Sequence, residues 1–331
     1  IGDAWEGDIG DWTPNDKFSS LEKVAAKIKE YGYIPGIWLA PFSVSETSTL
    51  FMEHPDWLVK DGNGNPKVAY ENWNKKIYAL DTTVPRAVDW LTSLFEHLKD
   101  CGFEYFKIDF LFAAAIQGKR FENVTPVQAY IQGLNTIRQA VGDSFVLGCG
   151  APLLPSVGYV DGMRIGPDTA PYWDANGPDI GHPNAYYALR NALTRWYING
   201  IWWWNDPDCL MLRKVDTQLS DVQRELYTLV SLLLDNMIIQ SDNLSYEIDD
   251  GLWNVVSEYR KYGKRKVLLS GIMSGQYNIT SCGVDGCDLL SITDLEKCVF
   301  TYSKDSGDIK LKKTIEIQDD GRRFNYYNEN D

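Results

Sequence analysis

Histidine is scarce in this sequence, which has only His54, His97 and His182 among its 331 residues. A catalytic metal centre built on several imidazoles is therefore not expected, and the same scarcity argues against a Ser-His-Asp triad. No apolar stretch is long enough to cross a bilayer, so no membrane partner is expected.

Positive charge and cysteine are also in short supply. The chain has 32 Lys and Arg against 46 Asp and Glu, and its net charge of −14 argues against a nucleic-acid partner. Six cysteines are too few for a small secreted disulfide scaffold. Cys282 and Cys287 resemble half of a metal site, but no second pair follows them, so neither a metal nor a cofactor is expected. We expect a cytoplasmic location, and the oligomeric state stays open.

Tryptophan, in contrast, is abundant, with 12 residues. Large aromatic side chains stack on the apolar faces of sugars, although they serve hydrophobic cores equally well. Six of them fall at the ends of predicted strands or in the loops that follow. We predict that these six lie on the rim of a sugar-binding cleft: Trp5, Trp12, Trp38, Trp57, Trp73 and Trp173.

Apolar, β-rich runs alternate with amphipathic helical segments, and the first strand lacks the Gly-rich phosphate-binding turn that usually marks an open doubly wound sheet. The pattern predicts an α/β fold, a (β/α)8 TIM barrel over residues 1–262 with a truncated first strand, followed by a small antiparallel β domain over residues 263–331. The predicted barrel strands are residues 1–3, 33–40, 76–80, 105–110, 145–149, 161–165, 201–205 and 237–241. Helices are predicted from the capping box at residues 19–22 to Gly32, from Pro85, from Pro126, and over residues 184–197 and 220–234.

Active sites of such barrels lie at the carboxyl ends of the strands. The fourth predicted strand places Lys107 and Asp109 on one face, and Phe106, Ile108 and Phe110 on the other. We therefore expect an ammonium group beside a carboxylate in the barrel mouth. The alternative is an ion pair that only fixes the geometry of the barrel.

Two further segments add polar groups. Arg164 ends the sixth predicted strand, and a Gly-Pro turn brings Asp168 back over the site, although a plain salt bridge between the two is the alternative. Asn205, Asp206 and Asp208 follow three consecutive Trp residues and either bind hydroxyl groups or cap a turn. Two carboxylates, Asp109 and Asp168, thus converge on one mouth, as glycoside hydrolysis requires.

Five strings now resemble glycoside hydrolase family 36, within clan D, and above all its compact α-galactosidases of thermophilic bacteria: GIWLAPF at 36–42, YFKIDFLF at 105–112, GCG at 148–150, RIGPD at 164–168 and WNDPD at 204–208. The likeness covers nearly the whole chain in unchanged order. It implies a retaining α-galactosidase that cleaves terminal α-linked galactose from oligosaccharides of the melibiose and raffinose type.

The resemblance also implies roles for single residues. Asp109 would be the nucleophile, and Asp168 the general acid and base. The substrate-binding residues would be Asp3, Trp38, Lys107, Cys149, Arg164, Asn205 and Asp206. In a retaining enzyme the two catalytic carboxyl groups lie about 5–5.5 Å apart.

Two departures from the family pattern leave alternatives open. Gly2 stands where the family has the first of two aspartates, and the family's N-terminal β-sandwich domain does not precede residue 1, which is expected of a fragment or a processed form. The alternatives are a related α-glycosidase such as an α-N-acetylgalactosaminidase, and a sugar-binding fragment with impaired or no catalysis.

Overall fold

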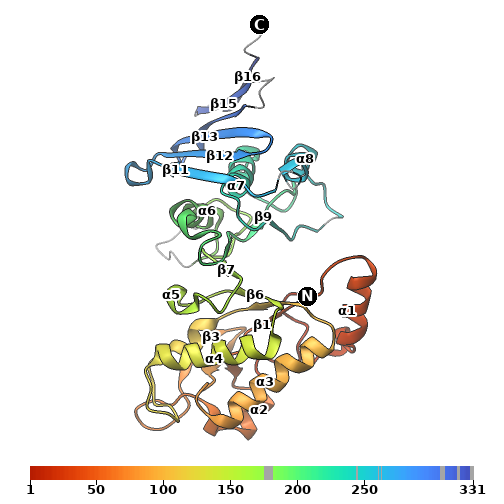
Figure 1. Cartoon of the computed structure of the whole chain (residues 1–331), viewed down its shortest axis with the longest axis vertical. Coiled ribbons are helices and arrows are strands. Elements are labelled where there is room, and N and C mark those ends of the chain that lie inside the picture. The colour runs from red at the N-terminus through yellow and green to blue at the C-terminus, as the bar shows by residue number, and fades with distance from the viewer. Residues whose placement is uncertain are drawn as a thin grey trace. The chain divides into compact units, whose positions relative to one another are not determined.

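The computed structural model describes residues 1–174, 182–243, 245–259, 261, 263–305, 310–318 and 321–328, the last two ranges as backbone only. The chain forms two compact units, Ile1–Met163 and Arg164–Asp331, and each is described by itself (Figure 1). This division after Met163 differs from the predicted domain boundary after residue 262, which stays a prediction.

The first unit is built on a parallel sheet in the order β1 (Gly36–Leu39), β5 (Tyr105–Ile108), β6 (Phe145–Gly148) and β7 (Gly162–Arg164). These strands lie within the predicted ranges. Ile1 runs alongside β1, because its ammonium group donates to Gly36 O at 2.6 Å and its carbonyl accepts from Trp38 N at 3.0 Å. The predicted end of a strand at residues 1–3 therefore contacts the sheet, although these residues form no regular strand.

Three helices of the first unit, those that begin at Leu21, Pro85 and Pro126, were predicted from the sequence, whereas the two short helices were not. The helices are α1 (Leu21–Glu30), α2 (Thr49–Glu53), α3 (Pro85–Asp100), α4 (Pro126–Val141) and α5 (Leu153–Ser156), with 3-10 helices at Asp16–Phe18, Pro55–Trp57 and Leu111–Ala115. The N-cap of α1 is Ser20, whose side chain accepts from Lys23 N, so the capping box predicted over residues 19–22 is replaced by a single cap. Thr125 forms a capping box with Gln128 at the start of α4. Gly32 has a φ of 79° just after α1, which confirms the predicted helix end.

The third predicted strand does not join the parallel sheet. Its residues form β4 (Lys75–Ala79), which pairs antiparallel with β2 (Ser43–Ser45) and β3 (Val68–Asn72). Trp73 and Asn74 connect β3 to β4 with φ values of 51° and 56°. Two consecutive residues with positive φ favour a tight hairpin. This local turn holds β4 against β3, so the prediction of a parallel strand here is wrong.

The second unit contains β8 (Trp204–Asp206), β9 (Cys209–Leu210) and β10 (Ile239–Gln240), and β9 and β10 pair in parallel. Its helices are α6 (Ala185–Thr194), α7 (Asp221–Leu233) and α8 (Asp250–Tyr259), with a 3-10 helix at Trp196–Ile198. Asn184 and Ser220 cap α6 and α7, as their predicted starts require. The seventh predicted strand is shifted towards the C-terminus, because Gly200, with a φ of 68°, forms a turn before it.

A six-stranded antiparallel sheet completes the second unit. It consists, in this order, of β11 (Lys266–Ser270), β12 (Tyr277–Gly283), β13 (Gly286–Asp294), β14 (Val299–Asp305), β15 (Lys310–Gln318) and β16 (Gly321–Asn328), with a 3-10 helix at Ile272–Ser274. Cys282 and Cys287 lie opposite each other on β12 and β13 and form a disulfide, so they are not half of a metal site. The predicted C-terminal antiparallel sheet is confirmed.

Candidate active site

Asp109 follows directly after β5, and both of its carboxylate oxygens accept hydrogen bonds. The indole N–H of Trp38 donates to Oδ2 at 3.1 Å, and the backbone N–H of Phe110 donates to Oδ1 at 2.7 Å. The backbone of Asp109 itself stays in register with β1, because its N–H donates to Leu39 O at 2.8 Å. The carboxylate is therefore fixed at the carboxyl end of the parallel sheet.

The chain turns sharply immediately after this carboxylate. Phe110 has a left-handed backbone, with φ 50° and ψ 33°, and precedes the 3-10 helix Leu111–Ala115. This conformation ends the strand alternation, so Phe110 does not share the buried face of Phe106 and Ile108 as the sequence predicted. Its ring instead stacks on Tyr70 and meets Trp73 edge-on.

Gly150 makes room for this turn. It has a φ of 54°, and a Cβ at this position would lie 3.2 Å from Phe110 Cα and N and 3.3 Å from Asp109 Oδ1. Such distances are closer than side-chain carbons normally approach, and the positive φ also disfavours any residue with a Cβ. The glycine of the 148–150 string thus allows the carboxylate and the turn to pack against β6.

Tyr70 faces the same region from β3. Its hydroxyl lies 2.8 Å from Ser43 Oγ on β2. Burial raises the pKa of the Tyr70 hydroxyl, and the negative charge of Asp109 adds to this rise although the hydrogen bond with Ser43 opposes it. Tyr70 is not among the predicted site residues, because only the antiparallel pairing of β2, β3 and β4 brings it here.

The six tryptophans predicted on one rim do not form a single surface. Trp5, Trp12 and Trp38 contact one another and are only 0%, 3% and 6% exposed. Trp57 stacks on His54 within a separate hydrophobic cluster. The prediction of a six-residue rim is therefore wrong, since most of these rings pack inside their unit, where their large apolar area is best buried.

The last two rings of the predicted rim also differ from each other. Trp73 contacts Trp38 edge-on, with ring centroids 6.4 Å apart, and lies beside the candidate site. Trp173 belongs to the second unit, where its indole N–H donates to Glu296 O at 3.2 Å.

Three other predicted residues of the first unit have different surroundings. Lys107 lies between Trp38 and Leu147 in the sheet register, and it forms no salt bridge with any residue in the described part of the chain. The expected pairing with Asp109 is thus not formed, and the ammonium group is available to a ligand. Asp3 is exposed, and Cys149 is a buried cysteine outside the Cys282–Cys287 disulfide, with its backbone paired to β5.

Arg164 is the centre of an ionic network in the second unit. Its guanidinium reaches Asp168 Oδ1 at 2.5 Å, Asp208 Oδ1 at 2.7 Å and Asp206 Oδ2 at 3.5 Å. The side chains of Arg164 and Asp206 are buried, whereas that of Asp168 is 67% exposed. Asp168 is thus a carboxylate held by a buried cation and open to solvent.

Asp208 ties this network to the rest of the unit. It has a φ of 76°, and its Oδ2 accepts from Thr169 N at 2.7 Å while its N–H donates to Asp206 Oδ1 at 2.7 Å. The Thr169 hydroxyl lies 2.7 Å from the hydroxyl of Tyr227 on α7. These bonds position the loop that carries Asp168. The acidic residues on both sides of Pro207 indicated from the sequence that Asp208 takes part in the site, whereas nothing in the sequence indicated Tyr227.

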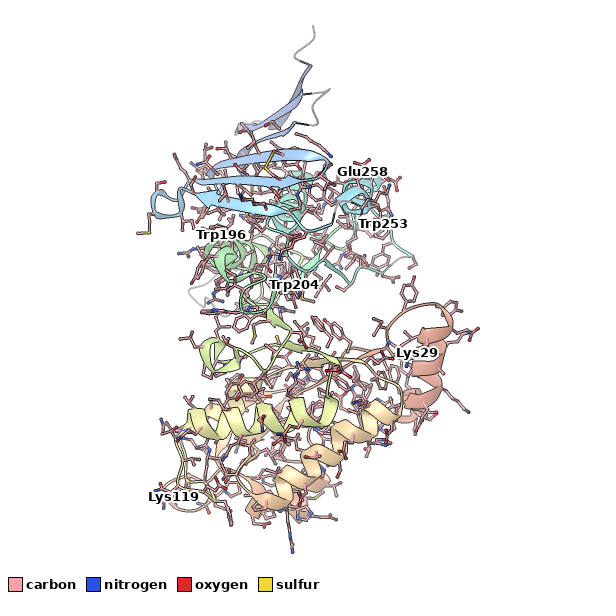
Figure 2. All side chains as sticks on the ribbon, viewed as in Figure 1. Lys29, Lys119, Trp196, Trp204, Trp253 and Glu258 are labelled. Atoms are coloured by element: carbon pink, nitrogen blue, oxygen red, sulfur yellow. A yellow bond between two sulfur atoms is a disulfide. The ribbon has the colours of Figure 1, made fainter. Side chains whose placement is uncertain are left out.

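Asn205 and Asp206 are engaged within the protein. The amide of Asn205 accepts from Trp203 Nε1 at 3.2 Å and donates to Arg195 O at 3.0 Å, and both residues are fully buried. Trp204, labelled in Figure 2, is the exposed member of this segment. The predicted role of Asn205 and Asp206 in substrate binding stays a prediction.

Asp109 belongs to the first unit and Asp168 to the second. That their carboxyl groups face each other at the distance of a retaining enzyme stays a prediction. Within the described residues, no group of three or more His, Cys, Asp or Glu side chains is placed to hold a metal ion. No helix in the same ranges has the length and apolarity needed to span a membrane.

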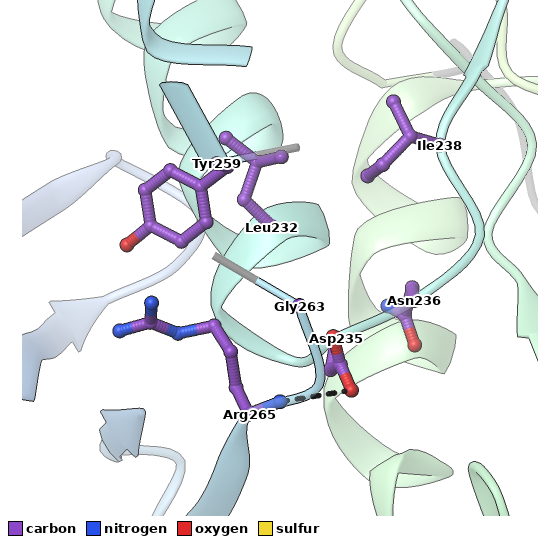
Figure 3. A pocket seen from close by; sticks show the side chains of 7 residues that line it. All are labelled: Leu232, Asp235, Asn236, Ile238, Tyr259, Gly263 and Arg265. Carbon is purple, nitrogen blue, oxygen red and sulfur yellow. Dashed lines mark hydrogen bonds between the residues drawn. The ribbon is translucent and has the colours of Figure 1, made fainter. Parts of the chain in front are cut away.

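The second unit also has a cavity of about 170 Å³ that contains none of the predicted site residues (Figure 3). Its lining comes from α7, the segment after α7, α8 and the segment that precedes β11. Asn236 is buried there, and neither atom of its amide has a hydrogen-bond partner among the described residues. The lining residues are Leu232, Asp235, Asn236, Ile238, Tyr259, Gly263 and Arg265.

Comparison with known proteins identifies similar chains. The family model described as Melibiase matches residues 3–145. The α-galactosidase TtGalA of Thermus thermophilus, solved with p-nitrophenyl α-D-galactopyranoside, is 31% identical and has a TM-score of 0.74 over 84% of this chain and 57% of its own. The α-galactosidase of Escherichia coli is 32% identical over 90 residues, which are 26% of this chain and 12% of that protein.

A more distant structure supports the fold. The family 36 α-galactosidase AgaA of Geobacillus stearothermophilus is 15% identical, with a TM-score of 0.62 over 96% of this chain and 44% of its own. Together with the parallel strands and the C-terminal antiparallel sheet, these likenesses confirm the predicted fold class. The matched part of this chain spans 57% of TtGalA, 44% of AgaA and 12% of the Escherichia coli protein.

Proposed function

Because this chain belongs to the melibiase family of glycoside hydrolases, we propose that it removes terminal α-linked galactose from oligosaccharides by double displacement. The observation that carries the proposal is the carboxylate of Asp109, held by two N–H donors at the carboxyl end of β5. Galacto-oligosaccharides of the melibiose and raffinose type are the proposed substrates. The Thermus thermophilus relative, solved also with stachyose, supports this substrate class.

In the first step, an oxygen of Asp109 attacks the anomeric carbon of galactose, and the bond from that carbon to the leaving oxygen breaks. Asp168 transfers its proton to the leaving oxygen. In the second step, Asp168 takes a proton from water, whose oxygen attacks the same carbon and releases Asp109. Two inversions return the α configuration.

The geometry of each unit fits these roles. Hydrogen bonds from Trp38 and Phe110 fix the carboxylate of the nucleophile, so that little reorientation is needed when it attacks. Arg164 holds Asp168 from inside the second unit, and the exposure of Asp168 leaves it open to a leaving group and to water. Lys107, with no salt bridge among the described residues, supplies donors for sugar hydroxyls.

The decisive experiment follows the hydrolysis of an aryl α-galactoside by proton NMR. First-formed α-galactose, together with loss of turnover in Asp109→Ala, is the expected result. First-formed β-galactose would overturn double displacement, and normal turnover in Asp109→Ala would overturn the assignment of the nucleophile. Galactose binding without any hydrolysis would favour a sugar-binding fragment, and hydrolysis of only the N-acetylgalactosaminide would favour the related glycosidase. The cytoplasmic location stays a prediction.

A further inference from the structure

A strained backbone follows directly after the proposed nucleophile. Phe110 has a left-handed conformation although it is neither glycine nor asparagine. Such a conformation costs on the order of 1–3 kcal/mol and persists only where the surrounding structure holds it in place. The residues that hold Phe110 therefore also restrain the peptide plane between Asp109 and Phe110, which carries the N–H that reaches the carboxylate.

Aromatic contacts hold the ring of Phe110. It stacks on Tyr70 with ring centroids 4.9 Å apart and planes 7° from parallel, and it meets Trp73 edge-on at 5.3 Å. Stacked aromatic pairs contribute about 0.5–1.5 kcal/mol beyond the area they bury, which is comparable to the backbone strain. Tyr70 is itself anchored through its hydroxyl to Ser43, on another strand of the antiparallel sheet.

Gly150 supports the turn from the opposite direction. Its missing side chain leaves the space that a Cβ would fill at 3.2 Å from Phe110 Cα. Its carbonyl also accepts from Phe112 N at 2.8 Å, which starts the 3-10 helix correctly. The left-handed conformation is thus defined both by the stacked ring and by the glycine.

The consequence for Asp109 is geometric. The Phe110 N–H lies in the peptide plane that joins it to Asp109 and reaches Oδ1 at 2.7 Å, while Trp38 occupies Oδ2. This plane is anchored on one side by the bond from Asp109 N–H to Leu39 O and on the other by the bond from Phe112 N–H to Gly150 O, so a change in the left-handed turn between them has to rotate it. If the Phe110 backbone relaxed, the carboxylate would keep one donor and rotate about its Cβ–Cγ bond. A displacement of about 1 Å in a reacting group can cost about 100-fold in rate.

We propose that Tyr70 is a positioning residue for Asp109, which it orients by stacking on Phe110 and stabilising its left-handed backbone. This inference rests on the proposed function, because it gives Asp109 the role of nucleophile. It assigns to the antiparallel β2–β4–β3 sheet a part in catalysis that the parallel sheet alone does not supply.

The test compares Tyr70→Leu, which removes the stacked ring, with Tyr70→Phe, which keeps the ring and removes the hydroxyl. The probe is 5-fluoro-α-D-galactopyranosyl fluoride, which loses fluoride and leaves a slowly hydrolysed galactosyl ester, detected as a mass increase. We expect Tyr70→Leu to be labelled about 10- to 100-fold more slowly than the unmodified chain, and Tyr70→Phe within about 3-fold of it. The affinity for free galactose should stay within about 3-fold in both, because oriented attack rather than ground-state binding is lost.

Gly150→Ala provides an independent variant, since its Cβ would press on Phe110 and Asp109 from the other direction. It should show the same slow labelling. Normal labelling of Tyr70→Leu would overturn the proposal, and so would a loss of galactose affinity and of melting temperature in proportion to the lost rate. Peptide mapping of the label in the unmodified chain separates the two proposals: a label on another residue contradicts the nucleophile itself, whereas a label on Asp109 with normal Tyr70→Leu kinetics contradicts only the role of Tyr70.

Discussion

The indole of Trp38 reaches Oδ2 of Asp109 at 3.1 Å although 71 positions separate the two residues in the sequence. The parallel pairing of β1 and β5 makes this contact possible, because Trp38 lies opposite Lys107, two residues before Asp109. A hydrogen bond to a charged group contributes about 1.5–3 kcal/mol. Trp38 therefore does more in this site than offer a flat surface to a sugar ring.

Trp38→Phe should lower kcat/KM on an aryl α-galactoside by about 10- to 100-fold, because it removes the donor to Oδ2 and keeps most of the aromatic area. Steady-state kinetics measures this loss. Trp12→Phe is the matched control: Trp12 contacts the Trp38 ring, and its own indole N–H has no hydrogen-bond partner among the described residues. Equal losses in both variants would mean that packing, not the hydrogen bond, determines the effect.

Arg164→Lys should lower the free energy of unfolding by about 3–5 kcal/mol, because one ammonium group cannot replace a guanidinium that is shared by three carboxylates. The buried carboxylate of Asp206 would then lie beside an ammonium group that cannot also pair with the other two carboxylates. Urea denaturation monitored by tryptophan fluorescence measures the change. Arg190→Lys, at an exposed position, should leave stability unchanged. A stable Arg164→Lys protein would show that the network contributes little to folding.

The elements that could be predicted from the sequence are those whose structure is determined by residues close together in the chain. Strand β5 and the capped helices α1 and α4 depend on nearby residues, so alternation and capping patterns predict them. The hairpin that makes β4 antiparallel depends on a left-handed backbone at both Trp73 and Asn74. Asn is common in such a conformation, but Trp is not, so the sequence contains no clear turn signal here.

The candidate site shows the same limit. Lys107 and Asp109 share a strand face by period alone, yet the partners of the carboxylate come from β1 and from a left-handed Phe110. Alternation predicted Phe110 on the opposite face, and its left-handed backbone, held by the stacking on Tyr70 and by the space at Gly150, explains why it is not there. Burial of Trp5 and Trp12 is likewise a property of tertiary packing, which the position of a residue in a loop does not reveal.

Gly2→Asp should be tolerated and should raise the affinity for galactose by about 10- to 100-fold, if the carboxylate pairs with a hydroxyl that now lacks an acceptor. No atom lies within 4 Å of a Cβ built at Gly2, so the new side chain meets open space. Isothermal titration of the Asp109→Ala variant with galactose, with and without the second change, isolates binding from turnover. Gly2→Asn is the uncharged control. An unchanged affinity would show that residue 2 does not reach the sugar.

Asn236→Leu should raise the free energy of unfolding by about 1–3 kcal/mol, because it removes a buried amide whose two polar atoms have no partner among the described residues. The new side chain has a similar volume and would lie beside Leu232 and Ile238, which line the same cavity. Urea denaturation is again the measurement, and Asn135→Leu, at an exposed position of α4, is the control. A loss of stability would show that the amide has a partner in solution, such as a bound water molecule.

Three free cysteines should react slowly with iodoacetamide at pH 8 in the folded protein. Burial raises the pKa of Cys101 and of Cys209 to about 11, and that of Cys298 to about 12, with neighbouring carboxylates adding to each rise. At pH 8 a thiol with a pKa near 11 is a thiolate in about one molecule in a thousand, whereas an unfolded cysteine, with a pKa of about 8.5, is ionised in about a quarter.

The same shifts determine the sign of the effect on stability. The folded protein holds these thiol protons more tightly than the unfolded chain does, so their contribution is complete below pH about 8.5 and is lost as pH rises towards about 11. Mass spectrometry after timed alkylation should show little modification at pH 8, a roughly tenfold faster reaction per pH unit from 8 to 10, and immediate modification in urea. Cys282 and Cys287 should stay unmodified without a reductant, because they form a disulfide. Rapid alkylation of the folded protein at pH 8 would contradict the burial that the structure gives these thiols.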